Sequence, residues 1–475
     1  MRTMPLAVWA LVIAAFAMGA DEFVVAGVVQ EIANSLHVSL GAVGRFESAY
    51  ALGVAIGAPL FTAIGSRVSR RFMLLATTGV FLVGNLVSLL GPTYGVILTG
   101  RVIAALAHGA FFGIAALFAA ELVSKAKQGR AIATVFAGST AATILGAPIG
   151  AAVGKALGWR ATFGTLVLFG VIAAIGLILL IPKTIGRERA RAVQSHDHNH
   201  SPHPAHAHAH AHGDAHAHAH GDAHAHGDGH AHGPHEHVAE AADGAELDAH
   251  ARMHMAGGGS APLRDQLRAL RRPAVWIGLL TTLLGYGGVF TSYVYLAPQL
   301  TEATGLGKQW VTPMFLLFGL GLFAGNQLGG KLADRNLRLA LPVSIGGLAV
   351  SLFVMTLLIH HPITAALGLF AYGVAAFSVV APLQLRVMQQ AGDAPDIASA
   401  ANISAFTLGS ALGIWLGGTA IDSGPGVTSV NWVGGSIAAA GLLLTLVSLG
   451  LDRVVNPALE SEPFHQEHQH LDAAE

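Results

Sequence analysis

The stretch His206-Ala-His-Ala-His-Ala-His212 lies within a polar segment, residues 183–272, that separates two long apolar parts of the chain. This segment has no apolar periodicity and cannot bury a hydrophobic core, so we interpret it as a disordered linker. Outward from it, residues 1–182 and 273–452 form two halves of nearly equal length. The linker therefore predicts a chain built from two matching domains.

The composition indicates a membrane protein. Only 11% of the residues are charged and 53% are hydrophobic, whereas soluble domains usually have about 25% charged residues. The sequence has no cysteine, which excludes disulfides, thiolate metal sites and cysteine nucleophiles. No nucleophile–base pattern or phosphate-binding loop is present, so we do not expect an enzyme.

Apolar runs of about 20 residues, the length that crosses a bilayer as a helix, recur through both halves. We predict an all-α membrane protein with twelve transmembrane helices arranged as two six-helix halves. The spans of the first half cover roughly 5–28, 41–64, 72–91, 93–120, 130–154 and 161–182. Those of the second cover roughly 274–299, 308–332, 338–358, 362–386, 396–420 and 430–451. An even number of spans puts both termini on one side.

The basic residues predict the orientation, because cytoplasmic loops carry an excess of Lys and Arg. Of the 26 Lys and Arg residues, 21 fall on the side of the linker and one lies within a span. The opposite loops carry the remaining four, Arg45, Lys155, Arg160 and Lys308. We therefore expect the termini, the linker and the C-terminal tail (453–475) to be cytoplasmic.

Matching basic loops follow the second span of each half. The second-half loop is Gly330-Lys-Leu-Ala-Asp334-Arg335-Asn-Leu-Arg338, and its first-half counterpart contains Arg67, Arg70 and Arg71. Two six-helix halves with a basic turn at matching positions are typical of a duplicated transporter.

The second-half loop resembles the Gly-x-x-x-Asp-Arg-x-Gly-Arg pattern of the major facilitator superfamily, with Leu337 at the second glycine. The first-half copy lacks both glycines and has Ser66 where Asp is usual, so only its arginines remain. The resemblance implies the major facilitator fold and alternating access to a central site. It also implies that these loops stabilise one of the two conformations by interhelical pairing.

Further motifs resemble the drug/proton antiporter branch with twelve helices, in particular its arabinose-efflux-like and chloramphenicol-efflux-like members. They are Gly19-Ala-Asp21-Glu22-Phe23, Leu98-Thr-Gly-Arg101 through His108-Gly109, Gly146-Ala-Pro148-Ile-Gly150, and Asn402-Ile-Ser-Ala-Phe406. Ala147 interrupts the usual Gly-Pro pair, and Thr407 replaces a usual Asn. The resemblance implies proton-coupled efflux of a small organic compound across a bacterial cytoplasmic (inner) membrane, and it gives Gly146, Pro148 and Gly150 a conformational role.

Charged residues within spans are the candidates for proton coupling, because a charge at bilayer depth costs about 2.5–3.5 kcal/mol on insertion scales. We expect Glu22 and Arg101 to carry the coupling, with Asp21 and His108 as further candidates. His108 lies two helical turns after Arg101, on the same face. The alternatives are two carboxylates solvated at the outer interface, a structural arginine that caps carbonyls or pairs with Glu22, and a hydrogen-bonded histidine.

The remaining candidates are an acidic residue near the start of the second span and several polar and aromatic residues of the second half. We expect Glu47 to face outer water beside Arg45. Polar and aromatic residues of the second half suit an organic substrate with a ring and hydroxyls, although each also fits simple packing. The predicted substrate-binding residues are Tyr286, Tyr293, Asn326, Gln384 and Asn402.

The histidine repeats predict metal binding by the linker, because imidazole suits Ni, Zn, Cu and Co. The candidate ligands are His206, His208, His210, His212, His216, His218 and His220. Efflux of Ni, Co or Zn is therefore the alternative function, and a metal sensor or store that transports nothing is a third. Apart from the proton as coupling ion and such a metal, we expect no cofactor and no nucleic acid partner. We expect the protein to be a monomer in the lipid bilayer.

Overall fold

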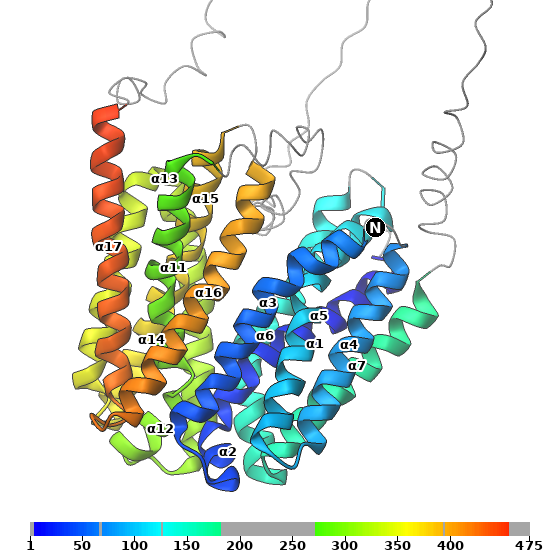
Figure 1. Cartoon of the computed structure of the whole chain (residues 1–475), viewed down its shortest axis with the longest axis horizontal. Coiled ribbons are helices and arrows are strands. Elements are labelled where there is room, and N and C mark those ends of the chain that lie inside the picture. The colour runs from blue at the N-terminus through cyan, green and yellow to red at the C-terminus, as the bar shows by residue number, and fades with distance from the viewer. Residues whose placement is uncertain (1–3, 66–68, 125–126, 182–270, 393–394, 456–475) are drawn as a thin grey trace, which may run out of the picture.

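The computed structural model describes residues 4–65, 69–124, 127–181, 271–392 and 395–455. Every regular element within these ranges is a helix. The long helices run between two ends of the molecule (Figure 1). At one of them, which we call the linker end, lie the start of the first helix, the end of the last helix, and the helix ends that come before and after residues 182–270. The chain thus crosses the molecule an even number of times.

The first half begins with helix α1 and ends with helix α7. Its helices are α1 (Leu6–Val24), α2 (Val29–Leu36), α3 (Leu40–Gly65), α4 (Arg70–Leu90), α5 (Tyr94–Glu121), α6 (Gln128–Leu157) and α7 (Trp159–Leu180). Ser69 caps α4, because its hydroxyl accepts a hydrogen bond from the Phe72 N–H at 3.3 Å. Gly158, with φ of 88°, joins α6 directly to α7, a backbone conformation that glycine adopts without strain.

The second half has the same order of long helices with more interruptions. Its helices are α11 (Pro273–Tyr293), α12 (Leu296–Pro298), a π-helical turn (Gln299–Ala303), a 3₁₀ turn (Lys308–Trp310), α13 (Val311–Leu358), α14 (Pro362–Ser378), α15 (Val380–Ala391), α16 (Pro395–Asp422) and α17 (Ser429–Val455). Proline at the first position starts α11 and α14, where its missing N–H costs no hydrogen bond.

The helices confirm the predicted fold of two six-helix halves. Among the described residues, ten helices are long and apolar enough to cross a membrane. One of them contains two spans, because α13 breaks at Asn336 (φ −160°, ψ 97°). The Asn336 side chain accepts a hydrogen bond from Leu339 N–H at 3.1 Å and so caps the second span. Helix α3, with 26 residues, completes the twelve.

The helix ends differ from the prediction in the first span of each half. The span predicted as 5–28 ends in a 3₁₀ turn, Val25–Gly27, and the span predicted as 274–299 ends at Tyr293. Hydropathy extends through both turns, since their residues are buried and apolar, and it does not reveal the change in backbone geometry.

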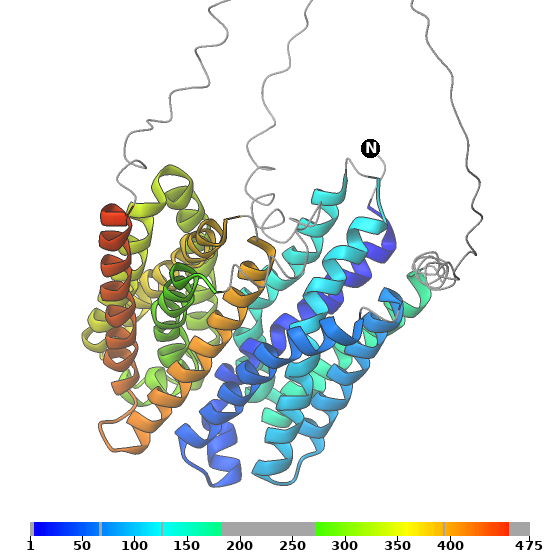
Figure 2. The ribbon, with the colours of Figure 1, turned by 45° about the horizontal axis from the view of Figure 1, so that its top comes forward.

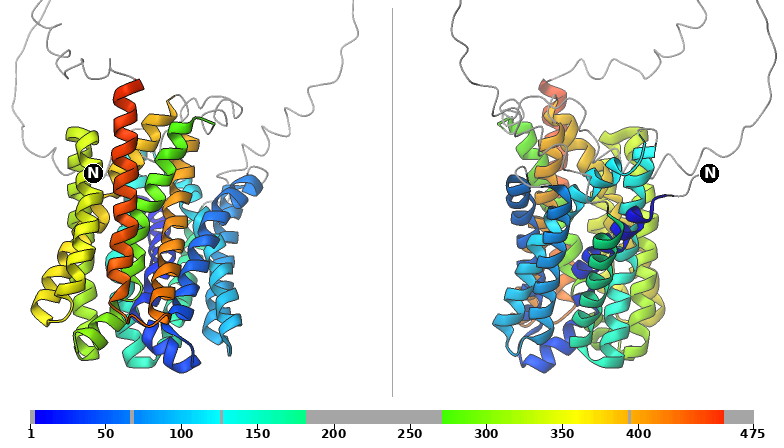
Figure 3. Two further views of the ribbon diagram at one scale, coloured as in Figure 1. Left: turned by 60° about the vertical axis from the view of Figure 1, so that its left-hand side comes forward. Right: turned by 90° about the vertical axis from the view of Figure 1, so that its right-hand side faces the viewer.

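The two halves contact each other through α3 with α16 and through α6 with α13. At the end opposite the linker, Asp422 accepts a hydrogen bond from the Ser39 hydroxyl at 2.9 Å and lies 4.0 Å from Arg45. Lys308 and Glu31 form a second contact between the halves there, at 3.3 Å. Toward the linker end the two bundles lean apart (Figures 1 and 2). The side views show the long helices of both halves running between the same two ends (Figure 3). The protein is therefore closed at the end opposite the linker.

Candidate functional site

A cluster of charged residues lies inside the first half, around Arg101 of α5. Arg101 has no exposed surface. Its guanidinium donates to the carboxylates of Asp21 on α1 and Glu47 on α3, the latter at 2.7 Å. It also lies over the ring of Tyr50, 4.1 Å from the centroid, in a cation–π contact. A buried guanidinium is tolerated in lipid only when it is paired in this way.

Further hydrogen bonds fix Asp21 in the cluster. Arg101 donates to the backbone carbonyl of Asp21 at 3.0 Å, and the Asn85 amide of α4 donates to the Asp21 carboxylate at 3.1 Å. Asp21 and Asn85 are both fully buried. Four helices, α1, α3, α4 and α5, therefore contribute side chains to this cluster.

A second branch leads from this cluster to Glu22. The Tyr50 hydroxyl is 2.9 Å from Nδ1 of His108, and Nε2 of His108 is 3.9 Å from the Glu22 carboxylate. The side chain of Glu22 is 30% exposed, whereas those of Asp21 and Arg101 have no exposed surface. Polar groups thus connect an accessible carboxylate to a buried ion cluster. Three carboxyl groups accompany one guanidinium, so the cluster has acceptors for a proton.

The structure brings together all four residues predicted for proton coupling. The expectation that Glu47 faces outer water beside Arg45 is wrong, because Glu47 is 4% exposed and bonds to Arg101. The alternative in which Arg101 pairs with Glu22 is also not what is found, since its partners are Asp21 and Glu47.

Three members of the cluster, Glu47, Tyr50 and Asn85, were not predicted. Glu47 and Tyr50 are three residues apart on α3 and share a helical face, which is the signal that points to a common partner. Asn85 is an amide within a mainly apolar span, where a polar side chain needs a partner.

The predicted substrate-binding tyrosines lie where α11 approaches the first half. Tyr286 contacts Phe406 in a T-shaped arrangement, with centroids 4.8 Å apart. Tyr293 stacks on Phe318 at 5.2 Å, and its hydroxyl is 3.5 Å from the backbone carbonyl of Phe23 on α1. Tyr293 therefore joins the halves, and both tyrosines are nearly buried in this conformation. Their contact with a substrate stays a prediction.

The predicted amides of the second half bond mainly to one another. Asn402 donates to the Gln384 carbonyl oxygen at 2.7 Å, and Gln384 donates to the Ser399 hydroxyl at 2.7 Å. These bonds connect α15 and α16 inside the half. The Asn402 carbonyl oxygen is buried without a hydrogen-bond partner among the described residues. Asn326 is half-buried on α13.

The basic loop of the first half pairs across helices. Arg70 forms an ion pair with Glu121 at the end of α5, and Arg71 donates to the carbonyl of Ile178 on α7 at 3.2 Å. Arg67 lies outside the described residues. The second-half residues Gly330, Asp334, Arg335 and Arg338 surround the break in α13, and Asp334 and Arg335 are exposed.

The glycines of the Gly146-Ala-Pro148-Ile-Gly150 motif lie against α1. A Cβ added at Gly146 would collide with Phe23, and one added at Gly150 would collide with the carbonyl of Val24. Pro148 is buried inside α6. The motif therefore lets α1 and α6 approach closely at the level of Asp21 and Glu22.

The linker histidines predicted to bind metal, His206 to His220, lie outside the described residues. Within the described part of the chain, no three His, Asp or Glu side chains are grouped so as to hold a metal ion.

Comparisons with known proteins agree with this architecture. Residues 11–404 match the family model described as Major Facilitator Superfamily. The chain is 34% identical over 440 residues to the inner membrane transport protein YdhP of Escherichia coli strain K12, covering 92% of this chain and 95% of that protein. It is 31% identical over 441 residues to a chloramphenicol resistance protein of Streptomyces lividans, covering 93% and 95%.

Among solved structures, the partially occluded inward-open xylose transporter XylE of E. coli aligns with a TM-score of 0.61 over 93% of this chain and 97% of that one. The sequences of these two chains are 15% identical, so this likeness concerns the fold alone. The motifs, the twelve spans in two halves and the family model lead to one conclusion: the chain is a membrane transporter of the major facilitator superfamily.

Proposed function

We propose that this protein exports a small organic compound, drug-like or sugar-like, in exchange for protons. The observation that carries the proposal is the connection from the partly exposed Glu22, through His108 and Tyr50, to the buried ion cluster of Arg101. Such a connection allows a proton bound at an accessible carboxylate to change the pairing inside the bundle.

The exchange follows from competition for one site. Of the three carboxyl side chains in the cluster, that of Glu22 is the most exposed. A proton that neutralises Glu22 removes the charge that orients the Glu22 side chain toward His108. A substrate that binds to the Glu22 carboxylate requires this proton to leave. Proton and substrate then occupy the site alternately, and rocking of the halves exposes it to one side after the other.

The related chloramphenicol resistance protein supports an organic substrate, and the related inner membrane transport protein supports a bacterial inner membrane location. In this orientation the linker end faces the cytoplasm, as the distribution of basic residues predicts. The structure is then closed toward the outside, the arrangement in which an exporter takes up its cargo.

The first experiment measures growth protection in a host that lacks its own efflux pumps, with phenicols, dyes, sugars and Ni, Co and Zn salts. Protection against an organic compound that survives deletion of residues 196–254 supports the proposal. Protection against metals alone, lost on that deletion, would overturn it in favour of divalent-metal efflux.

The coupling residue is tested with Glu22→Gln in vesicles that carry a proton gradient and the organic compound identified above. We expect export driven by the gradient to be lost while the variant still folds, because the Gln side chain resembles the protonated acid and has no proton to release to the substrate. Glu302→Gln is the matched control, because Glu302 is an exposed carboxylate outside the cluster. Unchanged gradient-driven export by Glu22→Gln would contradict the assignment.

A further inference from the structure

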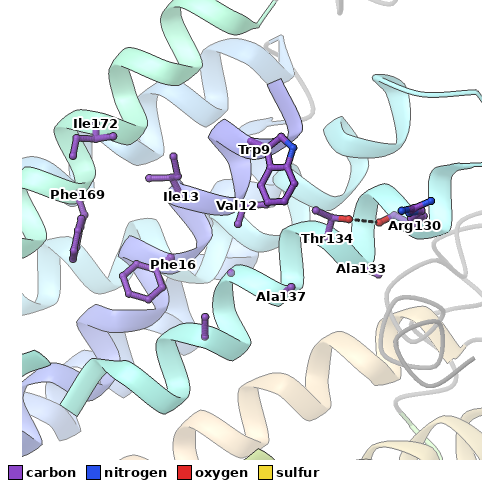
Figure 4. A pocket seen from close by; sticks show the side chains of 12 residues that line it. Trp9, Val12, Ile13, Phe16, Arg130, Ala133, Thr134, Ala137, Phe169 and Ile172 are labelled. Carbon is purple, nitrogen blue, oxygen red and sulfur yellow. Dashed lines mark hydrogen bonds between the residues drawn. The ribbon is translucent and has the colours of Figure 1, made fainter. Parts of the chain in front are cut away.

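An apolar groove of about 870 Å³ runs along the outside of the first half, between α6 and α7, with α1 as its floor (Figure 4). Trp9, Ile13 and Phe16 line it from α1, Ala137 from α6, and Phe169 and Ile172 from α7. The groove is separate from the charged cluster, none of whose members lines it.

The groove faces the surroundings of the protein. Trp9 is 51% exposed, and Ile13 and Ile172 are exposed as well. The two helices that form its walls are joined at Gly158 and stand apart toward the linker end (Figure 1). Phe16 and Phe169 meet edge to face, with centroids 5.4 Å apart, across its floor. On a membrane-spanning surface, such a groove is open to lipid.

The depth of the groove matches one leaflet of a bilayer. Along α6 its lining extends from Arg130 to Ala141. Eleven steps of about 1.5 Å per helical residue give roughly 16 Å, about half of the roughly 30 Å thickness of the hydrocarbon core. An acyl chain that starts at the linker-end surface of the membrane would therefore end near the bottom of the groove.

Among the residues that line the groove, Arg130 is the cation, and it lies at the linker end of the α6 wall. Arg130, in the first turn of α6, is exposed, and within the described residues its guanidinium has no acidic partner. Apart from Arg130 itself and Thr134, whose hydroxyl donates to the Arg130 backbone carbonyl at 2.7 Å, the side chains of the walls are aliphatic or aromatic. The guanidinium suits a phosphate in two-point contact. An apolar groove with a guanidinium at its end is complementary to a lipid that has a long apolar chain and an anionic head.

We propose that this groove binds an anionic glycerophospholipid of the linker-end leaflet, with one acyl chain between α6 and α7 and its phosphate at Arg130. The bound acyl chain packs against the outer face of α1, the helix that also carries Asp21 and Glu22. Such a lipid therefore stabilises the position of α1 in the conformation described here.

The test uses the full-length protein in detergent and native mass spectrometry with phosphatidylglycerol or phosphatidylcholine of the same acyl chains. We expect phosphatidylglycerol to be retained preferentially, and Arg130→Gln to reduce its retention about fivefold, the effect of one cation at an anionic surface. Lys155→Gln is the matched control, because Lys155 is an exposed cation at the other end of α6 and should change nothing.

The acyl site is tested by filling it. Ala137→Phe places a ring in the groove and should reduce retention of both lipids, and Arg130→Lys, which preserves the charge, should keep most of the preference. Quenching of Trp9 fluorescence by brominated phosphatidylglycerol, compared with Trp9→Phe, locates the chain. Equal retention of the two lipids, displacement by inorganic phosphate, or no change in Arg130→Gln would overturn the proposal.

Discussion

At the scale of single residues, the charge balance around Arg101 is the main constraint on the first half. Its two direct partners, Asp21 and Glu47, come from different helices, and none of the three is appreciably exposed. A buried pair is weak evidence for stability, but removal of one partner is costly because it leaves an uncompensated charge. The cluster therefore holds α1, α3 and α5 together only while its charges match.

The first prediction concerns this balance. Arg101→Met should destabilise the protein by about 3–5 kcal/mol, because two carboxylates then lie buried without a cation. Adding Asp21→Asn should restore part of the loss, since one of the uncompensated charges is removed. Thermal unfolding in detergent measures both effects. A double variant that is no more stable than Arg101→Met would refute the charge balance as the cause.

At the scale of elements, α1 and α6 pack through glycines that allow their backbones to approach. The close contact of Gly150 with the Val24 carbonyl lies one turn from the residues of the charged cluster on α1. Close backbone packing replaces the hydrophobic effect as the force between helices in lipid. The position of Asp21 thus depends on a neighbouring helix to which it makes no bond.

The second prediction tests this close packing of α1 and α6 with Gly150→Ala. The new methyl group collides with a backbone carbonyl, and overpacking of this kind costs about 1–3 kcal/mol. Gly79→Ala on α4 is the matched control, because its added Cβ meets no atom within 4 Å. It should leave the protein equally stable or more stable by up to about 1 kcal/mol. Equal melting temperatures for the two variants would contradict the idea that the close packing of α1 and α6 stabilises the protein.

At the scale of the whole molecule, Asp422 holds the halves together at the end opposite the linker. It accepts hydrogen bonds from the Ser39 hydroxyl and from the Gly41 N–H at 3.3 Å, both in the first half. The alternating access proposed above requires this contact to open. The exposed position of Asp422 keeps its free energy small, as suits a contact that must form and break in each cycle.

The third prediction is that Asp422→Asn shifts the conformational equilibrium toward opening at this end. A loss of about 1 kcal/mol raises the open population roughly fivefold. Because the chain has no cysteine, Asn34→Cys and Ser423→Cys can carry spin labels without background, and pulsed electron resonance should find a larger fraction of long distances. The same pair in a Glu302→Gln background serves as the control. An unchanged distance distribution would show that other contacts keep this end closed.

The sequence by itself determined the twelve spans and the two halves, because backbone polar groups in lipid must be satisfied within a helix and apolar runs of fixed length follow. It also determined that Asp21, Glu22, Arg101 and His108 need an explanation, since buried charges are costly. Only the tertiary structure decided which carboxylates pair with Arg101. Its partners lie 54 and 80 residues away in the chain, and Glu47 is buried because helix packing, which local sequence does not encode, places it there.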